Sequence, residues 1–284
     1  MKYLIVKGWL GFGDRLQSLK MCVAYAQKYN LQIYVDWRDP LWSHGSEDFY
    51  TYFNLLMPTF NLSDLPEDAT YYPPYWKGHL NEQITYEFMN VHKDDNLTLN
   101  ILDNPFDADV IVYSCNGTRS VYPDSSFFAN VFRVIDPRIL NGVKRHSQAY
   151  PLQTSWGIHI RGTDRIKPHK RMFNIQAMVL NIVTQGGMNK PHIVIVSDDK
   201  DQAQIIKNYY PNAYTISNFA TNSTTGTHML TKDQLSISKD QLNVDMLIDF
   251  FVLAKCERVY TTVKDSRYAK EAQRLHPVVN NILS

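Results

Sequence analysis

The sequence predicts an α/β protein built from two Rossmann-like domains with a cleft between them. In both halves of the chain, short apolar runs of strand length alternate with stretches whose apolar residues recur at helical spacing. Strands that alternate with helices form a parallel sheet covered on both faces, and 284 residues are enough for two such domains. We expect residues 1–150 to form the first domain and residues 151–284 the second, with the junction near residues 149–154.

The first half opens with a strand, a glycine turn, a helix and a second strand. Residues 2–7 and 33–37 have strand character, and residues 16–29 keep the apolar spacing of an amphipathic helix. Because glycine lets a backbone approach a partner closely, the turn is a candidate binding element. Its residues are Gly11, Phe12, Gly13 and Asp14. The turn lacks the third glycine of the dinucleotide fingerprint, so it is weak evidence by itself.

The remainder of the first half is harder to interpret. Residues 38–106 are dense in aromatic residues and prolines, and they show no clear periodicity. The aromatic rings form either a packed, loop-rich wall or a face on which sugars stack. Packing is the stronger interpretation, because aromatic side chains mostly bury area. Beyond this region, residues 109–115 predict a strand, and residues 125–132 and 137–148 predict helices.

The second half alternates more regularly. Its apolar runs predict strands at residues 155–161, 192–197, 213–217 and 258–263. The stretches between and after them predict helices at residues 173–185, 200–209, 241–255 and 266–275. Residues 218–238 are rich in Thr, Asn and Ser and predict a long polar loop.

The strand that begins the second half carries the strongest functional signal. Trp156, Ile158 and Ile160 alternate with Gly157, His159 and Arg161, and a polar Gly-Thr-Asp-Arg sequence follows. Ligands of α/β sheets bind at the carboxyl ends of the strands, and the planar guanidinium group of an arginine matches phosphate oxygens. Arg161 is therefore a candidate phosphate ligand, oriented by Asp164. The alternative is a surface arginine next to a packing histidine.

Two further strand ends carry candidate ligands. After the strand at 192–197, we expect Asp198 to face a ligand and Asp199 to cap the following helix. After the last strand, Asp265 and Ser266 open a helix whose N–H groups suit a phosphate, although simple capping is the alternative. Asp249 lies within an apolar helix, and we interpret it as a buried hydrogen-bond anchor for the polar loop.

Composition excludes several classes of protein. The net charge of +1 gives no general attraction to nucleic acid or to an anionic membrane, and no stretch is long and apolar enough to span a bilayer. The three cysteines have no metal-ligand spacing and fit a reducing compartment, so we expect a soluble cytoplasmic protein. Hydrolase, zinc-protease and P-loop motifs are absent.

Metal use is not expected either. Two Asp-x-Asp patterns resemble those that hold a divalent cation on a nucleotide sugar. Asp107 and Asp109 precede a strand and so lie away from its ligand edge, while Asp199 and Asp201 open a helix, where acidic groups stabilise the helix dipole. Arg161 and helix N-termini can neutralise a diphosphate without a metal.

The strand ends and their polar residues together resemble those of the fucosyltransferase superfamily of GT-B fold. This superfamily includes α1,6-fucosyltransferases, nodulation-factor fucosyltransferases and protein O-fucosyltransferases. The resemblance covers most of residues 155–275 and about residues 8–37. The family pattern Gly-x-His-x-Arg-x-x-Asp falls on Gly157, His159, Arg161 and Asp164. It implies that His159 contacts the guanine side of the donor and that Arg161 is the catalytic arginine on the β-phosphate.

The resemblance extends to the other candidate positions. It implies that Asp198 takes guanine, that the polar loop around Gly226 contacts the donor, and that Asp265 and Ser266 belong to the family's serine-containing turn. The turn from Gly11 to Asp14 resembles the family's N-terminal glycine turn. One departure bears on the acceptor and on the sugar: the core α1,6 enzymes carry two adjacent arginines, whereas Gly162 follows Arg161 here.

The sequence therefore predicts a metal-independent, inverting glycosyltransferase that transfers fucose from GDP-fucose to a glycan acceptor. Arg161 stabilises the leaving diphosphate, and Asp14 is the candidate base that activates the acceptor hydroxyl, unless it only closes its turn. One alternative is the same fold with another donor, such as UDP-xylose. The other is a non-catalytic protein that binds a sugar nucleotide.

Overall fold

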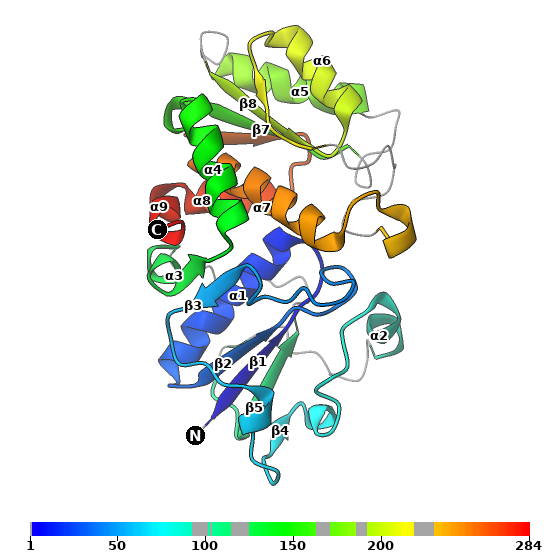
Figure 1. The fold of residues 1–284 in the computed structure, drawn as a ribbon, viewed down its shortest axis with the longest axis vertical. Helices are drawn as coiled ribbons and strands as arrows, with labels where there is room; N and C mark the ends of the chain where they lie inside the picture. Colours follow the sequence, from blue (N-terminus) through cyan, green and yellow to red (C-terminus); the bar gives the residue numbers. More distant parts are fainter. Residues whose placement is uncertain are drawn as a thin grey trace. The chain divides into compact units, whose positions relative to one another are not determined.

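The computed structural model describes residues 2–92, 102, 104–114, 125–162, 171–185, 192–218 and 230–284. The chain divides into two compact units (Figure 1). The first unit comprises Met1–Ile135 and Asn280–Ser284, and the second comprises Asp136–Val279. The division lies before α4 (Pro137–Ala149) rather than near residues 149–154, because α4 packs against α7 (Lys239–Lys255) of the second unit.

The first unit is organised around a parallel sheet of strand order β2-β1-β5-β4. Its strands are β1 (Tyr3–Lys7), β2 (Gln32–Asp36), β4 (Tyr71–Tyr72) and β5 (Val110–Ser114). All five residues of β1 and of β5 are buried, as continuous apolar strands of a covered parallel sheet should be. The helix α1 (Phe12–Lys28) packs on β1 and β2, and the segment around residues 60–84 packs on the other face.

Two short strands far apart in the sequence add an antiparallel pair to the first unit. They are β3 (Phe53–Leu55) and β6 (Phe132–Val134), and β6 directly follows α3 (Ser125–Val131). The aromatic region expected from the sequence forms a packed wall here, because Trp37, Trp42 and Phe49 are at most 2% exposed. Packing was therefore the correct interpretation for these rings.

The second unit contains a parallel sheet of strand order β10-β7-β8-β9. Its strands are β7 (Trp156–Ile160), β8 (Ile193–Ser197), β9 (Tyr214–Thr215) and β10 (Arg258–Thr261). Its helices besides α4 and α7 are α5 (Arg171–Thr184), α6 (Lys200–Tyr209) and α8 (Arg267–Leu275). Figure 1 shows α5 and α6 on one side of β7 and β8, with α4, α7 and α8 on the other side.

The alternation expected along β7 decides which helix meets which side chain. Ile158 and Ile160 belong to the core that also contains Ile175 of α5 and Ile206 of α6. Gly157 faces α7, and a Cβ atom at this position would lie 2.7 Å from the Cδ2 atom of Leu253. The glycine is therefore required for the close approach of α7 to the sheet.

The described residues also form several short elements. They are α2 (Tyr86–Val91), α9 (Val279–Ile282) and the 3-10 turns at Leu62–Asp64, Pro74–Trp76, Leu152–Thr154, Lys232–Gln234 and His276–Val278. Among the residues described, no helix is both long and apolar enough to cross a membrane.

Candidate functional site

The candidate site lies where β7, β8 and β10 end, at one edge of the second sheet. Because these strands run parallel, their carboxyl ends meet at this edge, which is where α/β proteins bind ligands. The backbone N–H of Arg161 donates to the Thr262 hydroxyl at 3.1 Å, and the backbone N–H of Gly162 donates to the Asp198 carboxylate at 2.7 Å. These two bonds tie β7 to its neighbours on both sides.

His159 is enclosed beneath this edge. Its ring is 7% exposed and stacks on Tyr268 of α8 with ring centroids 5.0 Å apart. Its Nδ1 atom lies 3.2 Å from the Thr261 hydroxyl and 3.4 Å from the Ser266 hydroxyl. Burial, followed by the charge of Arg161, lowers the pKa of His159 to about 3, so the imidazole is neutral at physiological pH. A contact between His159 and a donor remains a prediction.

The charge of Arg161 acts near the start of α8. It contributes to the pKa values of both His159 and Tyr268, although burial is the largest influence on each. Ser266 is the N-cap of α8, and its hydroxyl accepts the N–H of Ala269 at 3.3 Å. Asp265 is exposed and pairs with Lys270 at 3.2 Å. The capping alternative is therefore realised by Ser266, which also faces His159.

The start of α6 forms the other side of this edge. Asp199 is the N-cap of α6 and accepts the N–H of Gln202 at 3.0 Å, as the sequence predicts. A Cβ atom at Gly162 would lie 2.6 Å from the Asp199 Cβ atom and 2.0 Å from the Gln202 Nε2 atom. The position that departs from the family pattern therefore has no room for a second arginine unless the start of α6 moves.

Asp249 forms a hydrogen bond with Ser217, just before the polar loop, and an anchoring role for the loop itself stays a prediction because residues 219–229 lie outside the described residues. The backbone N–H of Ser197, at the end of β8, donates to the Ser217 hydroxyl at 2.9 Å, and this hydroxyl donates to Asp249 at 2.6 Å. Burial raises the pKa of Asp249 to about 7, against the opposing influence of the Ser217 bond. The network connects α7 to the ends of β8 and β9.

The glycine turn of the first unit differs from the expected arrangement. Helix α1 begins at Phe12, so Gly11 is its N-cap and Asp14 lies in its first turn. The Phe12 ring is 4% exposed and stacks with Trp42, so a donor contact at this position would have to come from the backbone. Gly13 is buried in the helix. The strained backbone is instead at Leu10, whose φ is 65°.

Sequence reasoning missed the charged groups at the carboxyl edge of the first sheet. Arg15 and Asp39 form a fully buried pair with an N···O distance of 2.7 Å. Lys7 and Asp36, the last residues of β1 and β2, form another buried pair at 2.7 Å, and Arg38 also binds Asp36. The sequence signal for these pairs was the Asp-x-Arg-Asp sequence at the end of an apolar strand, which places several charged side chains at one strand end.

The buried pairs of this edge also explain a glycine. A Cβ atom at Gly8 would lie 2.1 Å from the Arg15 guanidinium and 2.7 Å from the Asp39 carboxylate. Burial alone would raise the pKa of Asp36, but bonds from Arg38 and Lys7 outweigh it and lower that pKa. The carboxylate is therefore ionised and compensated within the unit.

The remaining candidate residues are either outside the described part of the chain or have structural contacts. Asp164 and Gly226 lie outside the described residues. Asp109 accepts bonds from the backbone and hydroxyl of Thr70, at 2.9 and 2.7 Å, and so has a structural role. Within the described part of the chain, no group of three or more His, Cys, Asp or Glu is arranged to hold a metal ion.

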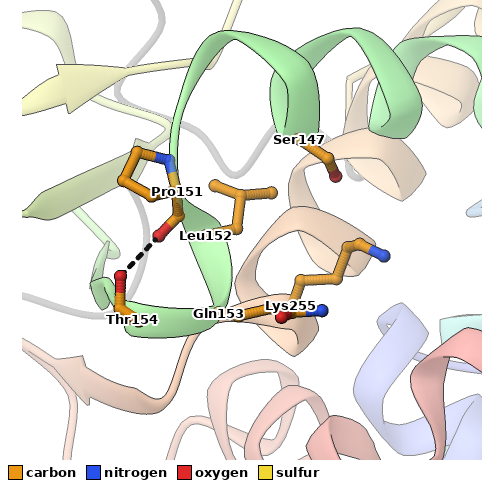
Figure 2. Close-up of a pocket in the computed structure, with 6 residues that line it drawn as sticks. All are labelled: Ser147, Pro151, Leu152, Gln153, Thr154 and Lys255. Atoms are coloured by element: carbon orange, nitrogen blue, oxygen red, sulfur yellow. Dashed lines mark hydrogen bonds between the residues drawn. The ribbon is translucent and has the colours of Figure 1, made fainter.

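A pocket of about 260 Å³ lies elsewhere on the second unit (Figure 2). It is formed by the end of α4, the turn that precedes β7 and Lys255 at the end of α7. Figure 2 shows the Thr154 hydroxyl bonded to the Pro151 carbonyl at its wall, at 3.3 Å. Because these segments precede β7 and β10, the pocket is at the amino edge of the sheet, opposite the candidate site.

Two units, each with a parallel sheet and flanking helices, define a GT-B-like α/β protein. No family model matches the sequence, and no curated protein matches it either. Solved structures do match. Fucosyltransferase NodZ from Bradyrhizobium has a TM-score of 0.70 and 15% identity, and the match covers 96% of this chain and 92% of NodZ. NodZ α-1,6-fucosyltransferase soaked with GDP-fucose matches with a TM-score of 0.69 and 15% identity, covering 98% of this chain and 94% of that chain.

Two further solved fucosyltransferases extend this comparison. POFUT1 in complex with GDP has a TM-score of 0.52 and 9% identity, and the match covers 96% of this chain and 94% of POFUT1. A variant of Arabidopsis thaliana FUT1 in complex with GDP has a TM-score of 0.55 and 14% identity, covering 97% of this chain and 68% of that chain. The chain therefore has the GT-B-like fold of these fucosyltransferases, which confirms the fold class expected from the sequence.

Proposed function

We propose that the protein is a glycosyltransferase that uses GDP-fucose as its donor. The observation that carries the proposal is the shared fold over nearly the whole chain, because the matching proteins include fucosyltransferases solved with GDP and with GDP-fucose. The chemistry of the second sheet's carboxyl edge supports it, since an arginine lies there beside the start of a helix. The alternative of a binding protein without catalysis keeps the fold but lacks transfer.

Arg161 has the central part in the proposed mechanism. As the bond between fucose and the diphosphate breaks, negative charge accumulates on the diphosphate. A guanidinium at the end of β7 and the N-terminal N–H groups of α8 stabilise this charge without reorganising. The buried His159 supports this edge through its contacts with the hydroxyl groups of Thr261 and Ser266.

The remaining contacts of the donor follow the family resemblance. His159 and Asp198 are proposed to face the guanine base, and Asp164, Gly226, Asp265 and Ser266 the remainder of the donor. The loop at Gly11, Phe12 and Gly13 is proposed to approach the donor through its backbone. Asp14 is the proposed base for the acceptor hydroxyl in an inverting, metal-independent transfer to a glycan. UDP-xylose is the competing donor.

Replacing Arg161 tests the mechanism. Arg161→Ala should lower the rate of transfer from GDP-fucose by about a hundred- to a thousandfold, because one preorganised donor of a transition-state anion contributes about 3–4 kcal/mol. Arg161→Lys keeps the positive charge but loses the planar guanidinium group, so its transfer rate should lie between those of Arg161→Ala and the wild type. GDP release and circular dichroism measure turnover and folding. Normal turnover of a folded Arg161→Ala protein would contradict the mechanism.

The identity of the donor can be tested separately. A ligand that binds only the folded protein raises its stability by about 2.7 kcal/mol at a hundredfold excess over Kd. Thermal unfolding in the presence of GDP, GDP-fucose, UDP and UDP-xylose should therefore show a rise in Tm of several degrees for the guanine nucleotides only. A rise with UDP-xylose alone would replace GDP-fucose as the proposed donor.

A further inference from the structure

A second polar cluster lies at the carboxyl edge of the first sheet, on the segment that leads into α2. Lys7, the last residue of β1, is buried and donates to the backbone carbonyl of Glu82 at 2.8 Å and to that of Leu80. Gln83 donates to the Asp36 carboxylate, at the end of β2, at 3.2 Å. These bonds fix residues 80–83 against the edge of the sheet, although the segment has no regular structure of its own.

Glu82 on this fixed segment contacts two side chains that precede it, Tyr75 and His79. We define the Tyr75 cluster as Tyr75, His79 and Glu82. The Glu82 carboxylate accepts the Tyr75 hydroxyl and lies 2.7 Å from the His79 Nδ1 atom. The rings of Tyr75 and His79 stack with centroids 4.5 Å apart and planes 19° apart. The side chains of His79 and Glu82 are 45% and 44% exposed, so the cluster is ordered and also open to solvent.

The protonation of the cluster follows from these contacts. Burial and the bond to Glu82 raise the pKa of Tyr75 to about 12, so its hydroxyl stays protonated. The bonds from Tyr75 and then His79 lower the pKa of Glu82, which keeps its carboxylate ionised. Because Nδ1 of His79 contacts Glu82, Nε2 is the ring nitrogen on the side away from Glu82, where it can bond a hydroxyl group of a ligand.

This combination selects a particular class of ligand. A carboxylate and an imidazole nitrogen accept hydroxyl groups, while a ring face contacts the apolar C–H face of a pyranose. The negative charge of Glu82 repels phosphate and carboxylate groups. A neutral sugar satisfies all three groups, whereas a sugar nucleotide's diphosphate does not. The cluster also lies at the edge of the sheet where α/β proteins bind ligands.

We propose that the Tyr75 cluster binds a neutral sugar unit of the acceptor glycan. The proposal rests on the proposed glycosyltransferase function, because it assigns the acceptor of that reaction to the first unit. The acceptor is then an uncharged oligosaccharide whose hydroxyl groups bond Glu82 and His79, and the exposed His79 ring, which stacks on Tyr75, is the ring that contacts the sugar.

A glycan array of neutral and sialylated oligosaccharides tests the proposal. The labelled wild-type protein should bind neutral members, and Glu82→Gln and His79→Ala should each weaken this binding by about tenfold or more, because a hydrogen bond to a charged group contributes about 1.5–3 kcal/mol. Glu87→Gln is the matched control, since Glu87 is an exposed acid on the neighbouring helix α2. It should bind as the wild type does.

Titration of the same proteins with GDP separates this inference from the proposed function. All four proteins should bind GDP equally, which also shows that the variants are folded. Loss of neutral-glycan binding in Glu82→Gln and His79→Ala alone supports the proposal. Equal glycan binding by all proteins, binding of sialylated members only, or no binding of neutral glycans by the wild type overturns it. Failure of the wild type to bind GDP counts against the proposed donor and leaves the glycan result readable.

Discussion

The carboxyl edges of the two sheets are both formed by parallel strands, but they use their charged groups differently. In the first unit, Lys7 and Arg15 are removed from water and each is paired with a carboxylate at 2.7 Å. In the second unit, Asp198 accepts the N–H of Gly162, and Asp199 caps α6. The first edge therefore contains ion pairs that are closed within the unit, whereas the carboxylates of the second edge bind backbone N–H groups that hold the end of β7 and the start of α6 in place.

The two edges, although both formed by parallel strands, are therefore suited to different roles. A buried ion pair gains little net free energy over an apolar pair, but it costs several kcal/mol to break. The charges of the first edge are thus neutralised by each other, and the edge can hold the Tyr75 cluster in place. At the second edge, Arg161 follows β7 and Ser266 begins α8, and both a guanidinium group and helix N–H groups suit an anion.

The largest expected effect on stability comes from breaking the buried ion pair of Arg15 and Asp39 in the first unit. Asp39→Ala leaves the buried Arg15 guanidinium without its carboxylate, so the free energy of unfolding should fall by about 3–5 kcal/mol. Asp68→Ala, at an exposed acid of the same unit, should change it by less than about 0.5 kcal/mol. Urea unfolding of both variants measures the difference, and equal effects would contradict the structural role of the pair.

A smaller effect is expected where the second sheet meets α7. Gly157→Ala places a Cβ atom 2.7 Å from Leu253, so the packing must shift and the free energy of unfolding should fall by about 1–3 kcal/mol. Gly45→Ala is the control, because a Cβ atom there meets nothing within 4 Å. If Gly157→Ala were as stable as Gly45→Ala in thermal unfolding, the glycine of the family pattern would not be explained by helix packing.

A third effect, of similar size, depends on pH and concerns the carboxyl group of Asp249. The folded pKa of Asp249 is raised from 3.8 to about 7, so the folded state holds a proton that the unfolded state loses between these values. Its contribution therefore destabilises the fold as pH rises from about 4 to 7 and is constant above.

Asp249→Asn removes this penalty and should make the protein about 1–3 kcal/mol more stable at pH 8 while changing little at pH 4. His159 acts in the opposite direction, because its folded pKa of about 3 means that only the unfolded state takes up a proton as pH falls below 6.5. The variant should therefore lose stability as pH falls from 6.5 to 4. Denaturant unfolding across this range checks the slope, and a variant less stable than the wild type at pH 8 would refute the assignment.

The second unit was predictable because its pattern is strong and local. Every residue of β7 and β8 is buried. β8 appears in the sequence as an apolar run and β7 as an alternation of apolar residues with Gly157 and His159, and the expected boundaries of both strands agree with the structure to within about one residue. The alternation along β7 also placed His159 and Ile158 on opposite faces. The alternation could not show how deeply His159 is buried, because its burial depends on Tyr268, which is more than a hundred residues away in the chain.

The first unit was less predictable because its order comes from contacts distant in sequence. Strand β3 pairs with β6 across the antiparallel register Phe53–Val134, and neither strand has a periodic signal of its own over three residues. Phe12 was assigned to a binding turn because it lies between two glycines. It is helical and buried because Trp37 and Trp42 surround its ring, which no local pattern shows.

The central claim is that the diphosphate of the donor binds at the second edge and not at the first. Calorimetric titration of GDP into the wild type, Arg161→Ala and Arg38→Ala tests it, because Arg38 is a partly exposed arginine that follows a strand end of the first sheet. We predict that Arg161→Ala binds GDP about tenfold to a hundredfold more weakly and that Arg38→Ala binds it as the wild type does. Unchanged affinity in Arg161→Ala, or a loss confined to Arg38→Ala, would contradict the account.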